Sequence, residues 1–422
     1  MKIIEPIILK GTREFGPEEM AKRNLVMEKI KNIFARFGYD PIETPILNPA
    51  ETILGKYGEE GDRLTYSFED NGKKRLALPY DLTVPFARYF AANWQTLPLP
   101  FKRYQIQRVW RAEKPQKGRL REFYQCDIDI IGTESLIAEA EIARVIATVF
   151  EELNFKNFKI KINSRRLMND ILNSFGITEN EMEVMRIIDK LAKIGQEAVQ
   201  VELTKLGVEN PVELLDLIQQ NSIEKLENFD TSEVENFLEY CKNLGISEEV
   251  IEFTPSLARG LDYYTGIIFE VVSKDNPELG SLCGGGRYDN LCGLFSKEPF
   301  SGVGVAFGFE RLMIAMEERG EFENLTLNSQ ILVTIFDEKT IENSLKIYEL
   351  LTTAGLNTEI YFEPEKLKKQ FKYADRKKIP FVIVQGPDEK AQNQVTVKSL
   401  QSGKQKTISI DQLITFFNGY EK

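Results

Sequence analysis

The stretch from Arg108 to Asp129 carries the densest set of side chains that could do chemistry. Two apolar-containing segments flank a loop rich in Lys, Pro, Gly and Arg. This layout is typical of a β-hairpin with a cationic tip, and its arginines suit phosphates because a planar guanidinium can bond two oxygens at once. Charge alone favours an ordinary surface hairpin with ion pairs, because runs of charged residues usually face the solvent. Strand alternation would place four side chains on one face: Phe123, Gln125, Asp127 and Asp129.

Three glycine-rich segments add candidate site residues. The segment 258–266 reads ARGLDYYTG and suggests a constrained loop that turns an arginine and two tyrosines into a cavity, with a structural tyrosine corner as the alternative. The segment 283–289, CGGGRYD, is typical of a flexible turn that lets the backbone approach a ligand. The segment 302–312 has glycine spacing that is wrong for a dinucleotide fingerprint. It predicts a strand that enters a helix, with Arg311 near the helix start.

The chain contains 0 histidines among its 422 residues. This excludes Ser-His-Asp and Cys-His nucleophile systems, His-ligated zinc and an imidazole proton shuttle, because each needs the ring nitrogen. Any catalysis must use carboxylates, Arg, Lys, Tyr, backbone dipoles or a hard metal ion.

These segments need a scaffold, and the sequence predicts much of it. Pro17 suits a first helical position, and helical apolar spacing continues until Gly38. The segment 39–47 contains two prolines and predicts an extended edge segment. A largely antiparallel sheet is predicted by alternating apolar segments at 75–79, 102–110, 123–131, 158–162 and 267–273.

The remainder of the chain predicts two further parts. Residues 166–249 have few aromatics and many Leu, Ile, Glu and Lys, with helical periodicity from Met182 to Leu206, and indicate a helical insertion. After residue 330 strands and helices alternate, which predicts a small α/β domain with a mostly parallel sheet. Its expected strands are 331–336, 358–362 and 381–384, and its expected helices are 341–354 and 365–378.

Charge and composition indicate a multidomain globular protein of the cytosol. The length predicts two or three domains, no apolar run approaches the roughly 20 residues of a membrane span, and the start lacks a signal-peptide layout. Four cysteines without a CxxC pair fit a reducing compartment. The net charge is −11, but residues 330–422 carry 14 Lys/Arg against 12 Asp/Glu. The basic excess lies in 366–378, which holds seven cations and one anion.

The segments together resemble the histidyl-tRNA synthetases, a family of class II aminoacyl-tRNA synthetases. Arg111-Ala-Glu113 with Phe123 is similar to motif 2, the segment 308–312 to motif 3, and the helix ending at Gly38 followed by Glu-Thr-Pro to motif 1. Four segments of this chain resemble the histidine-specific signatures of the family: ARGLDYYTG at 258–266, GGGRYD at 284–289, PYDLTVP at 79–85 and PQKGRLREFYQCDIDIIG at 115–132. The similarity covers essentially the whole chain.

The resemblance implies an α+β fold: a class II antiparallel-sheet catalytic domain with a helical insertion, plus a C-terminal α/β anticodon-binding domain. The expected catalytic domain comprises residues 1–165, with motifs 1 and 2, and residues 250–325, with the histidine motifs and motif 3. The insertion would span 166–249 and the anticodon-binding domain 326–422.

The resemblance also implies roles for the ATP-binding residues. Arg111 would bind the α-phosphate, Glu113 the adenine amino group, and Arg119 the terminal phosphates. Phe123 and Arg311 would sandwich the adenine ring, which a planar guanidinium can do by stacking.

The implied amino-acid site combines carboxylates, tyrosines and one arginine. Arg259 would contact both the histidine carboxylate and the α-phosphate and act in catalysis together with Arg111. Asp81 and Asp129 stand where bacterial relatives often carry the longer Glu, so the pocket must compensate for the shorter side chains. The amino and carboxylate ends would be held by Asp81, Thr83 and Gln125, and the imidazole pocket lined by Asp129, Tyr263, Tyr264 and Tyr288.

The implied reaction needs no histidine from the enzyme. An ionised carboxylate attacks the α-phosphorus of ATP without a general base, so positioning and electrostatics can supply the rate. Mg²⁺ would neutralise the departing pyrophosphate, and no protein-bound metal site is expected. Transfer to the 3′-terminal ribose of the tRNA for histidine follows, with a phosphate oxygen of the adenylate taking the proton as a hypothesis.

The implied partners are histidine, ATP, the tRNA and a second copy of the chain in a cytoplasmic homodimer, with no membrane. The basic stretch would meet the anticodon stem, with Phe371 and Tyr373 available to stack on unpaired bases; a solvated helix face is the alternative. The tRNA-contacting candidates are Lys368, Lys369, Lys372 and Arg376.

Three other functions compete with this interpretation. A non-catalytic regulatory subunit of ATP phosphoribosyltransferase would usually lack the anticodon-binding domain and parts of the ARGLDYYTG motif, both of which are present. A synthetase for threonine, proline or glycine would share motifs 1 to 3 but not the histidine signatures. A nicotinamide oxidoreductase is disfavoured by the glycine spacing.

Overall fold

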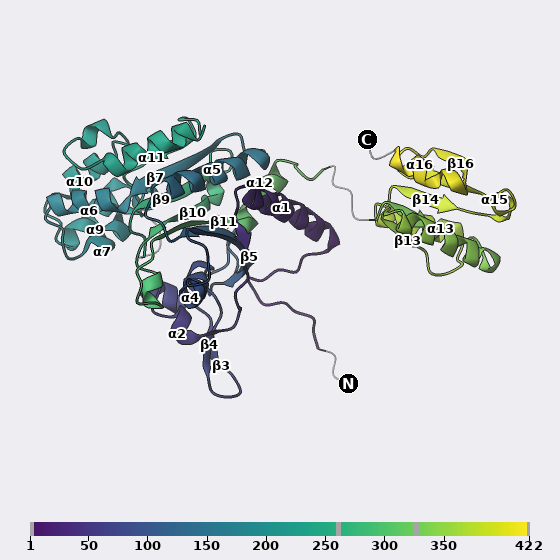
Figure 1. Ribbon diagram of the computed structural model, residues 1–422, viewed down its shortest axis with the longest axis horizontal. Coiled ribbons are helices and arrows are strands. Elements are labelled where there is room, and N and C mark those ends of the chain that lie inside the picture. The colour runs from purple at the N-terminus through teal and green to yellow at the C-terminus, as the bar shows by residue number, and fades with distance from the viewer. Residues whose placement is uncertain (1–3, 259–262, 324–328, 420–422) are drawn as a thin grey trace. The chain divides into compact units, whose positions relative to one another are not determined.

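The computed structural model describes residues 4–258, 263–323 and 329–419 (Figure 1). Arg259, expected in the active site, therefore lies outside the described residues. The chain divides into two compact units: Met1–Glu14 with Val26–Gly320, and Phe15–Leu25 with Glu321–Lys422.

An eight-stranded sheet, counted within the described residues, forms the centre of the first unit. Its interior pairs are antiparallel, and the edge strands β1 and β8 pair in parallel with their neighbours. The largely antiparallel sheet is confirmed, although the edge segment expected at 39–47 has only two residues in strand conformation. The strand order is β1 (Asp40–Pro41), β5 (Phe101–Trp110), β6 (Glu122–Ile131), β11 (Gly302–Gly308), β10 (Ser281–Tyr288), β9 (Ile267–Ser273), β7 (Phe158–Ser164) and β8 (Ile251–Phe253).

The two faces of this sheet differ in chemistry. Helices α1 (Pro17–Arg36) and α5 (Ile137–Glu152) cover an apolar face, where the ring of Phe307 lies 5.7 Å from Phe34 and 6.3 Å from Phe150. The opposite face of β6 carries Gln125, Asp127 and Asp129, because side chains alternate along a strand. The sheet thus presents a polar face on which a site can form.

The expectation of a flexible turn at CGGGRYD was wrong, since all of this segment except Asp289 belongs to β10. Its glycines serve close packing between strands. A Cβ on Gly285 would lie 2.0 Å from the carbonyl oxygen of Gly304, and a Cβ on Gly304 would lie 2.0 Å from Oδ1 of Asp129. A side chain at Gly304, which lies opposite Asp129, would fill the space above the polar face.

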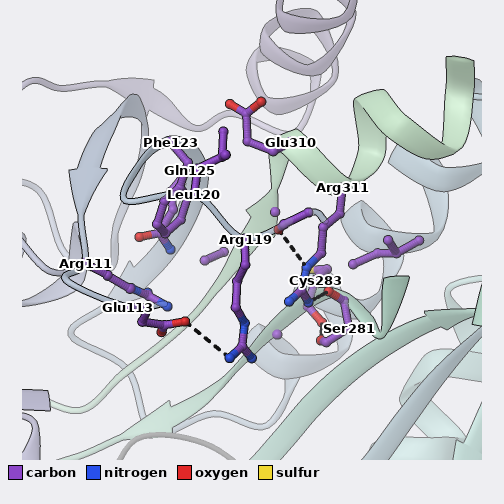
Figure 2. A pocket seen from close by; sticks show the side chains of 15 residues that line it. Arg111, Glu113, Arg119, Leu120, Phe123, Gln125, Ser281, Cys283, Glu310 and Arg311 are labelled. Atoms are coloured by element: carbon purple, nitrogen blue, oxygen red, sulfur yellow. Dashed lines mark hydrogen bonds and ion pairs between the residues drawn. The ribbon is translucent and has the colours of Figure 1, made fainter. Parts of the chain in front are cut away.

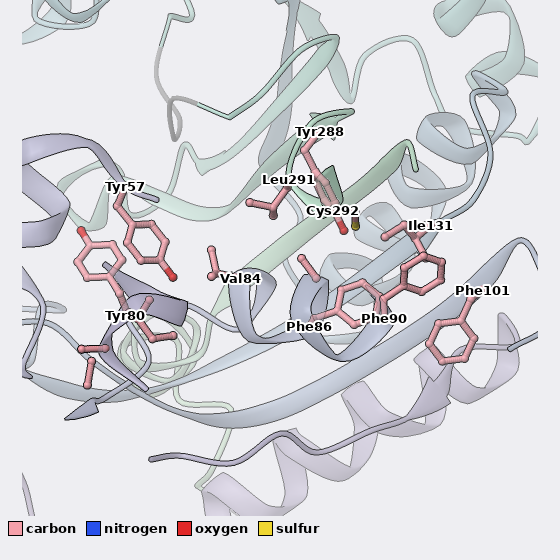
Figure 3. Packing of buried hydrophobic residues seen from close by; sticks show 14 residues of the cluster. Tyr57, Tyr80, Val84, Phe86, Phe90, Phe101, Ile131, Tyr288, Leu291 and Cys292 are labelled. Atoms are coloured by element: carbon pink, nitrogen blue, oxygen red, sulfur yellow. The ribbon is translucent and has the colours of Figure 1, made fainter. Parts of the chain in front are cut away.

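Short elements close the first unit around that face. In helix α4 (Thr83–Asn93), Val84, Phe86 and Phe90 are buried, and they join a cluster with Phe101 and Tyr288 (Figure 3). The other elements are α2 (Ala50–Ile53), α3 (Gly58–Leu64), α12 (Phe309–Glu318) and a three-stranded sheet of β2 (Asn48–Pro49), β4 (Arg75–Ala77) and β3 (Ser67–Glu69).

The segment after β7 is helical, as its composition indicates. The periodicity noted from Met182 to Leu206 is divided into three helices. The break between the second and the third falls at Gly195, which adopts φ +81°. The helices are α6 (Arg165–Ser174), α7 (Glu181–Ile188), α8 (Leu191–Ile194), α9 (Gln196–Lys205), α10 (Pro211–Ile218) and α11 (Ser232–Asn243).

The second unit contains a five-stranded sheet, as described here, of order β13-β12-β14-β15-β16. The pairs of β12 are parallel, but the two pairs that involve β15 are antiparallel, so the expected mostly parallel sheet is only half correct. The strands are β12 (Ile331–Val333), β13 (Thr358–Ile360), β14 (Phe381–Val384), β15 (Gln394–Ser399) and β16 (Gln405–Ser409). The helices are α13 (Ile341–Thr353), α14 (Leu367–Arg376), α15 (Pro387–Ala391) and α16 (Leu413–Asn418).

Candidate active site

Two adjoining cavities open above the polar face of the central sheet. The first, of about 250 Å³, contains all five side chains expected to bind ATP (Figure 2). The second, of about 120 Å³, contains Asp81, Thr83 and three tyrosines. The cavities share four lining residues, so ligands in them would meet at one seam: Arg111, Gln125, Gly284 and Ala306.

Arg111 stands at the end of β5 and is fixed by three contacts. Its Nε donates to the carbonyl oxygen of Tyr80 at 3.0 Å. Its guanidinium carbon lies 4.4 Å from the centre of the Tyr80 ring and 5.2 Å from that of Phe123. The stacked guanidinium keeps its other nitrogens available at the seam, where they can bind an anion.

The other cationic groups of the first cavity come from the hairpin loop and from α12. Arg119 is half exposed and forms an ion pair with Glu113, Nη1 to Oε2, at 3.2 Å (Figure 2). Arg311 donates from Nη1 to the carbonyl oxygen of Ser281 and from Nε to that of Gly118 at 3.4 Å. Gly118 has φ +70°, and an added Cβ would lie 3.3 Å from Cγ of Arg311, so glycine is required at this approach.

Asp81 anchors the second cavity. Its Oδ1 accepts hydrogen bonds from the hydroxyl of Tyr57 at 2.8 Å and from the backbone nitrogen of Val84 at 3.0 Å. Its Oδ2 accepts from the hydroxyl of Tyr263 at 3.3 Å. Burial raises the pKa of Asp81, while these hydrogen bonds work in the opposite direction. The start of α4 thus holds a buried carboxyl group beside Thr83.

Three tyrosines line the second cavity together with Asp81. The ring of Tyr263 lies 4.9 Å from that of Tyr264 and 6.0 Å from that of Tyr288, both edge-on. Burial raises the pKa of each of these hydroxyls, so they remain protonated donors at neutral pH. Hydroxyls can donate and accept, which suits a ligand with both kinds of nitrogen.

Asp129 lies behind Tyr288, and the described residues that line the second cavity do not include it. Its Oδ1 accepts from the Tyr288 hydroxyl at 2.6 Å, and its Oδ2 pairs with the buried guanidinium of Arg103. Burial raises the pKa of Asp129, and Arg103 opposes the rise. Asp129 thus contacts Tyr288, which is one of the residues that line the second cavity.

Asp127, to which no sequence motif assigns a role, lies between Gln125 and Asp129 on the same face of β6. Its exposure is 1%, and neither of its carboxylate oxygens has a hydrogen-bond partner among the described residues. Burial raises its pKa well above the ordinary value, Arg103 lowers it, and Asp129 raises it further. Strand alternation was the only signal for this residue, because the pairing of β5 with β6, which places Gln105 opposite Asp127 and Arg103 opposite Asp129, is set by the fold.

Helix α14 carries the candidate tRNA contacts of the second unit. Lys368, Lys372 and Arg376 are exposed at intervals of four residues and make no ion pair within the described ranges. Lys369 instead pairs with Glu365. Three of the four expected cations therefore lie on one face of the helix.

The aromatics expected to stack on bases are engaged within the second unit. The Tyr373 hydroxyl donates to Glu359 at 2.7 Å and its ring lies 5.5 Å from that of Tyr361. Phe371 packs in the apolar cluster beneath α14, and Lys398 lies 5.1 Å from its ring centre.

Residues 4–258, 263–323 and 329–419 contain no group of three or more Cys, Asp or Glu side chains placed to hold a metal ion. Within the same ranges, every helix is too short or too polar to cross a membrane.

Comparison with known proteins identifies the family. A family model described as Histidyl-tRNA synthetase matches residues 11–312, and one described as Anticodon binding domain matches residues 330–419. Histidine–tRNA ligase of Cytophaga hutchinsonii is 41% identical over 451 residues, covering 97% of this chain and 99% of that protein. The corresponding ligase of Phocaeicola vulgatus is 40% identical over 451 residues, covering 97% and 98%.

A solved structure agrees with these relatives. The crystal structure of histidyl-tRNA synthetase from Nostoc sp. PCC 7120 has a TM-score of 0.87 and 32% identity, and the match covers 99% of this chain and 100% of that one. The resemblance inferred from the motifs and the class II fold are thereby confirmed. This chain belongs to the histidyl-tRNA synthetase family.

Proposed function

We propose that this protein is a histidine–tRNA ligase, which joins histidine and ATP into histidyl-adenylate and transfers histidine to the 3′-terminal ribose of its tRNA. The observation that carries the proposal is the pair of adjoining cavities that share Arg111 at their seam. An amino acid in the second cavity and ATP in the first would bring carboxylate and α-phosphorus together beside that guanidinium. Full-length relatives that are histidine–tRNA ligases support the same activity.

The first cavity supports ATP binding. Phe123 and Arg311 line it from β6 and α12, as a sandwich around the adenine ring requires, and Glu113 is available for the adenine amino group. Arg119 would exchange its ion pair with Glu113 for the terminal phosphates, because phosphate carries more charge than one carboxylate.

The second cavity supports histidine binding. Asp81, Thr83 and Gln125 would hold the amino and carboxylate ends, and the hydroxyls of Tyr263, Tyr264 and Tyr288 would meet the imidazole. Asp129 would act by fixing the Tyr288 hydroxyl.

The reaction needs positioning and charge stabilisation rather than a proton-abstracting ring. Arg111, and Arg259 as expected from its motif, would stabilise the charge that develops on the α-phosphate as the carboxylate attacks. Glu310 also lines the first cavity and would supply one of the one or two carboxylates that usually accompany phosphates around Mg²⁺. Bound there, Mg²⁺ would neutralise charge on pyrophosphate.

The tRNA would be held in part by the second unit. Residues 330–419 match an anticodon-binding family, and the cations of α14 suit the phosphates of the anticodon stem. The proposed division of the chain is a catalytic domain at 1–165 and 250–325, an insertion at 166–249 and an anticodon-binding domain at 326–422.

The protein would act as a cytoplasmic homodimer, since its substrates ATP and tRNA occur in the cytoplasm. Ile4, Ile7 and Leu9 are 87%, 78% and 60% exposed in the single chain, and burial against a second copy would remove this apolar surface from water. Light scattering of the purified protein measures the expected doubled mass.

Pyrophosphate exchange with each amino acid separately tests the activity. Exchange with histidine alone supports the proposal, whereas exchange with a different amino acid, or with none, contradicts it. Arg259→Ala is expected to lower histidine-dependent exchange by roughly 10²–10³-fold, the usual loss for a charge-stabilising donor. Near-wild-type exchange in that variant would remove Arg259 from catalysis.

A further inference from the structure

The second unit has a topological switch point at the carboxyl ends of its parallel strands. The chain passes from β12 through α13 to β13 on one side, and then through α14 to β14 on the other side of β12. Ile331 and Val333 of β12 pack in a cluster with α13, while Leu332 packs in a cluster with α14. The two helices therefore cover opposite faces, and a crevice between the ends of β12 and β13 is expected, where open α/β sheets bind ligands.

Both loops that leave this edge carry an exposed phenylalanine. Phe362, two residues after β13, is 90% exposed, the largest fraction among the large apolar side chains of the described residues. Phe336, in the loop after β12, is 41% exposed. A single exposed apolar residue is ordinary. Two at one switch point indicate a binding surface when the backbone that carries them is held in place.

The side chain of Gln370 holds the backbone of both loops in place. This residue of α14 is fully buried, and its Nε2 donates to the carbonyl oxygens of Ile335 and Glu365, both at 2.7 Å. Its Oε1 accepts from the backbone nitrogen of Ile335 at 3.0 Å. One amide thus ties the loop of Phe336 to the loop of Phe362, so the two rings are presented on supported backbone rather than on free loops.

The surrounding charge indicates the chemistry of the ligand. The Phe362 loop leads directly into α14, whose exposed stripe consists of Lys368, Lys372 and Arg376. Exposed aromatic rings beside a row of cations are the features with which proteins bind single-stranded nucleic acid, because bases stack on the rings and phosphates meet the cations. Phe371 and Tyr373 cannot fill the stacking role while they pack within the unit.

We propose that Phe362, with Phe336, is the stacking platform for unpaired bases of the tRNA anticodon loop, and that Lys368, Lys372 and Arg376 hold the adjoining phosphates. The inference rests on the proposed function, since the RNA is the tRNA that the ligase charges. Glu363, next to Phe362, can accept hydrogen bonds from the base edges and does not need to approach a phosphate.

The test compares two activities of the full-length protein. Phe362→Ala should lower kcat/KM for tRNA in aminoacylation by about 5- to 150-fold, the equivalent of about 1–3 kcal/mol for one stacked base. Histidine-dependent pyrophosphate exchange, which needs no tRNA, should stay within about twofold of wild type. Phe362→Trp should restore charging, because a larger ring preserves stacking. Phe68→Ala, at a 45% exposed phenylalanine of β3, is the matched control and should charge normally.

A second pair of variants tests the phosphate contacts. Lys368→Ala should weaken tRNA binding and reduce the slope of log affinity against log salt by about one unit, whereas Lys369→Ala, already paired with Glu365, should change the slope less. Wild-type charging by Phe362→Ala would overturn the inference. Equal losses of charging and exchange would also overturn it, because Phe362 would then act within the protein. Exchange by the unchanged protein tests the proposed function separately.

Discussion

Replacing Asp127 by asparagine should stabilise the empty first unit at neutral pH. The carboxyl group is 1% exposed, and its oxygens have no hydrogen-bond partner among the described residues. A buried polar group without a partner costs about 1–3 kcal/mol, and a charged one costs more. Asparagine has the same shape and no charge, so Asp127→Asn should raise the free energy of unfolding by about 1–3 kcal/mol at pH 7.

The sign of the pH dependence follows from the pKa. Burial raises the pKa of Asp127 well above its ordinary value of 3.8, so the unfolded chain loses this proton at lower pH than the folded protein. The contribution of this carboxyl group to the free energy of unfolding is therefore fully present below pH 3.8, and it is lost as the pH rises toward the folded-state pKa. The advantage of Asp127→Asn should therefore be absent near pH 3.8 and grow with pH.

The two tryptophans make the measurement specific. Trp94 and Trp110 both lie in the first unit, so urea denaturation followed by tryptophan fluorescence reports unfolding of that unit. Asp170→Asn, at an exposed position of α6, is the matched control and should leave the pH profile unchanged. A variant less stable than wild type at pH 7 would refute the reasoning. It would show that Arg103, whose Nε and Nη1 lack hydrogen-bond partners among the described residues, binds the Asp127 carboxylate in solution.

Three further substitutions test the walls of the two cavities. Gly304→Ala would place a Cβ 2.0 Å from Oδ1 of Asp129. It should reduce histidine-dependent exchange by about 10²-fold, the usual loss when a site residue is displaced by about 1 Å. Wild-type exchange by this variant would contradict this packing. Tyr288→Phe removes the donor to Asp129 and should raise KM for histidine by about 10- to 150-fold in the same assay, with KM for ATP unchanged as its control. Gly118→Ala strains a residue at φ +70° beside Arg311 and should raise KM for ATP by about 5- to 30-fold; an equal rise in KM for histidine would argue against a local effect.

Local patterns sufficed to predict the elements that carry the site. Alternation from residue 123 to 131 predicts one strand with Gln125, Asp127 and Asp129 on a common face, and β6 has that arrangement. The strand-to-helix transition that precedes Arg311 is likewise present as β11 and α12. Period-two and period-3.6 patterns depend only on neighbours along the chain, so they can be read without knowing the fold.

The features that the sequence did not predict are mainly contacts that depend on how neighbouring strands pair. Asp129 pairs with Arg103 because β5 and β6 place these residues opposite one another, and no local pattern indicates that pairing. The glycines of CGGGRYD have a turn-like composition, but neighbouring strands require them for close approach. The hairpin of β15 and β16 was not predicted, although the local sequence indicates it, since Gly403, at φ +71°, follows a strand of alternating residues.

The opposite charge of the two cavities explains how a zwitterionic amino acid would be oriented. Arg111, Arg119 and Arg311 outnumber the two glutamates of the first cavity, which favours phosphates. Around the second cavity Asp81 lines the wall and further carboxyl groups lie behind it, while its one lining guanidinium among the described residues is Arg111 at the seam. The field therefore directs the amino acid's carboxylate toward the seam and its ammonium toward Asp81, and low dielectric strengthens both preferences. That orientation presents the nucleophilic oxygen to the α-phosphorus before any chemistry begins, which is why a chain with no imidazole can still supply the rate by arrangement of charge.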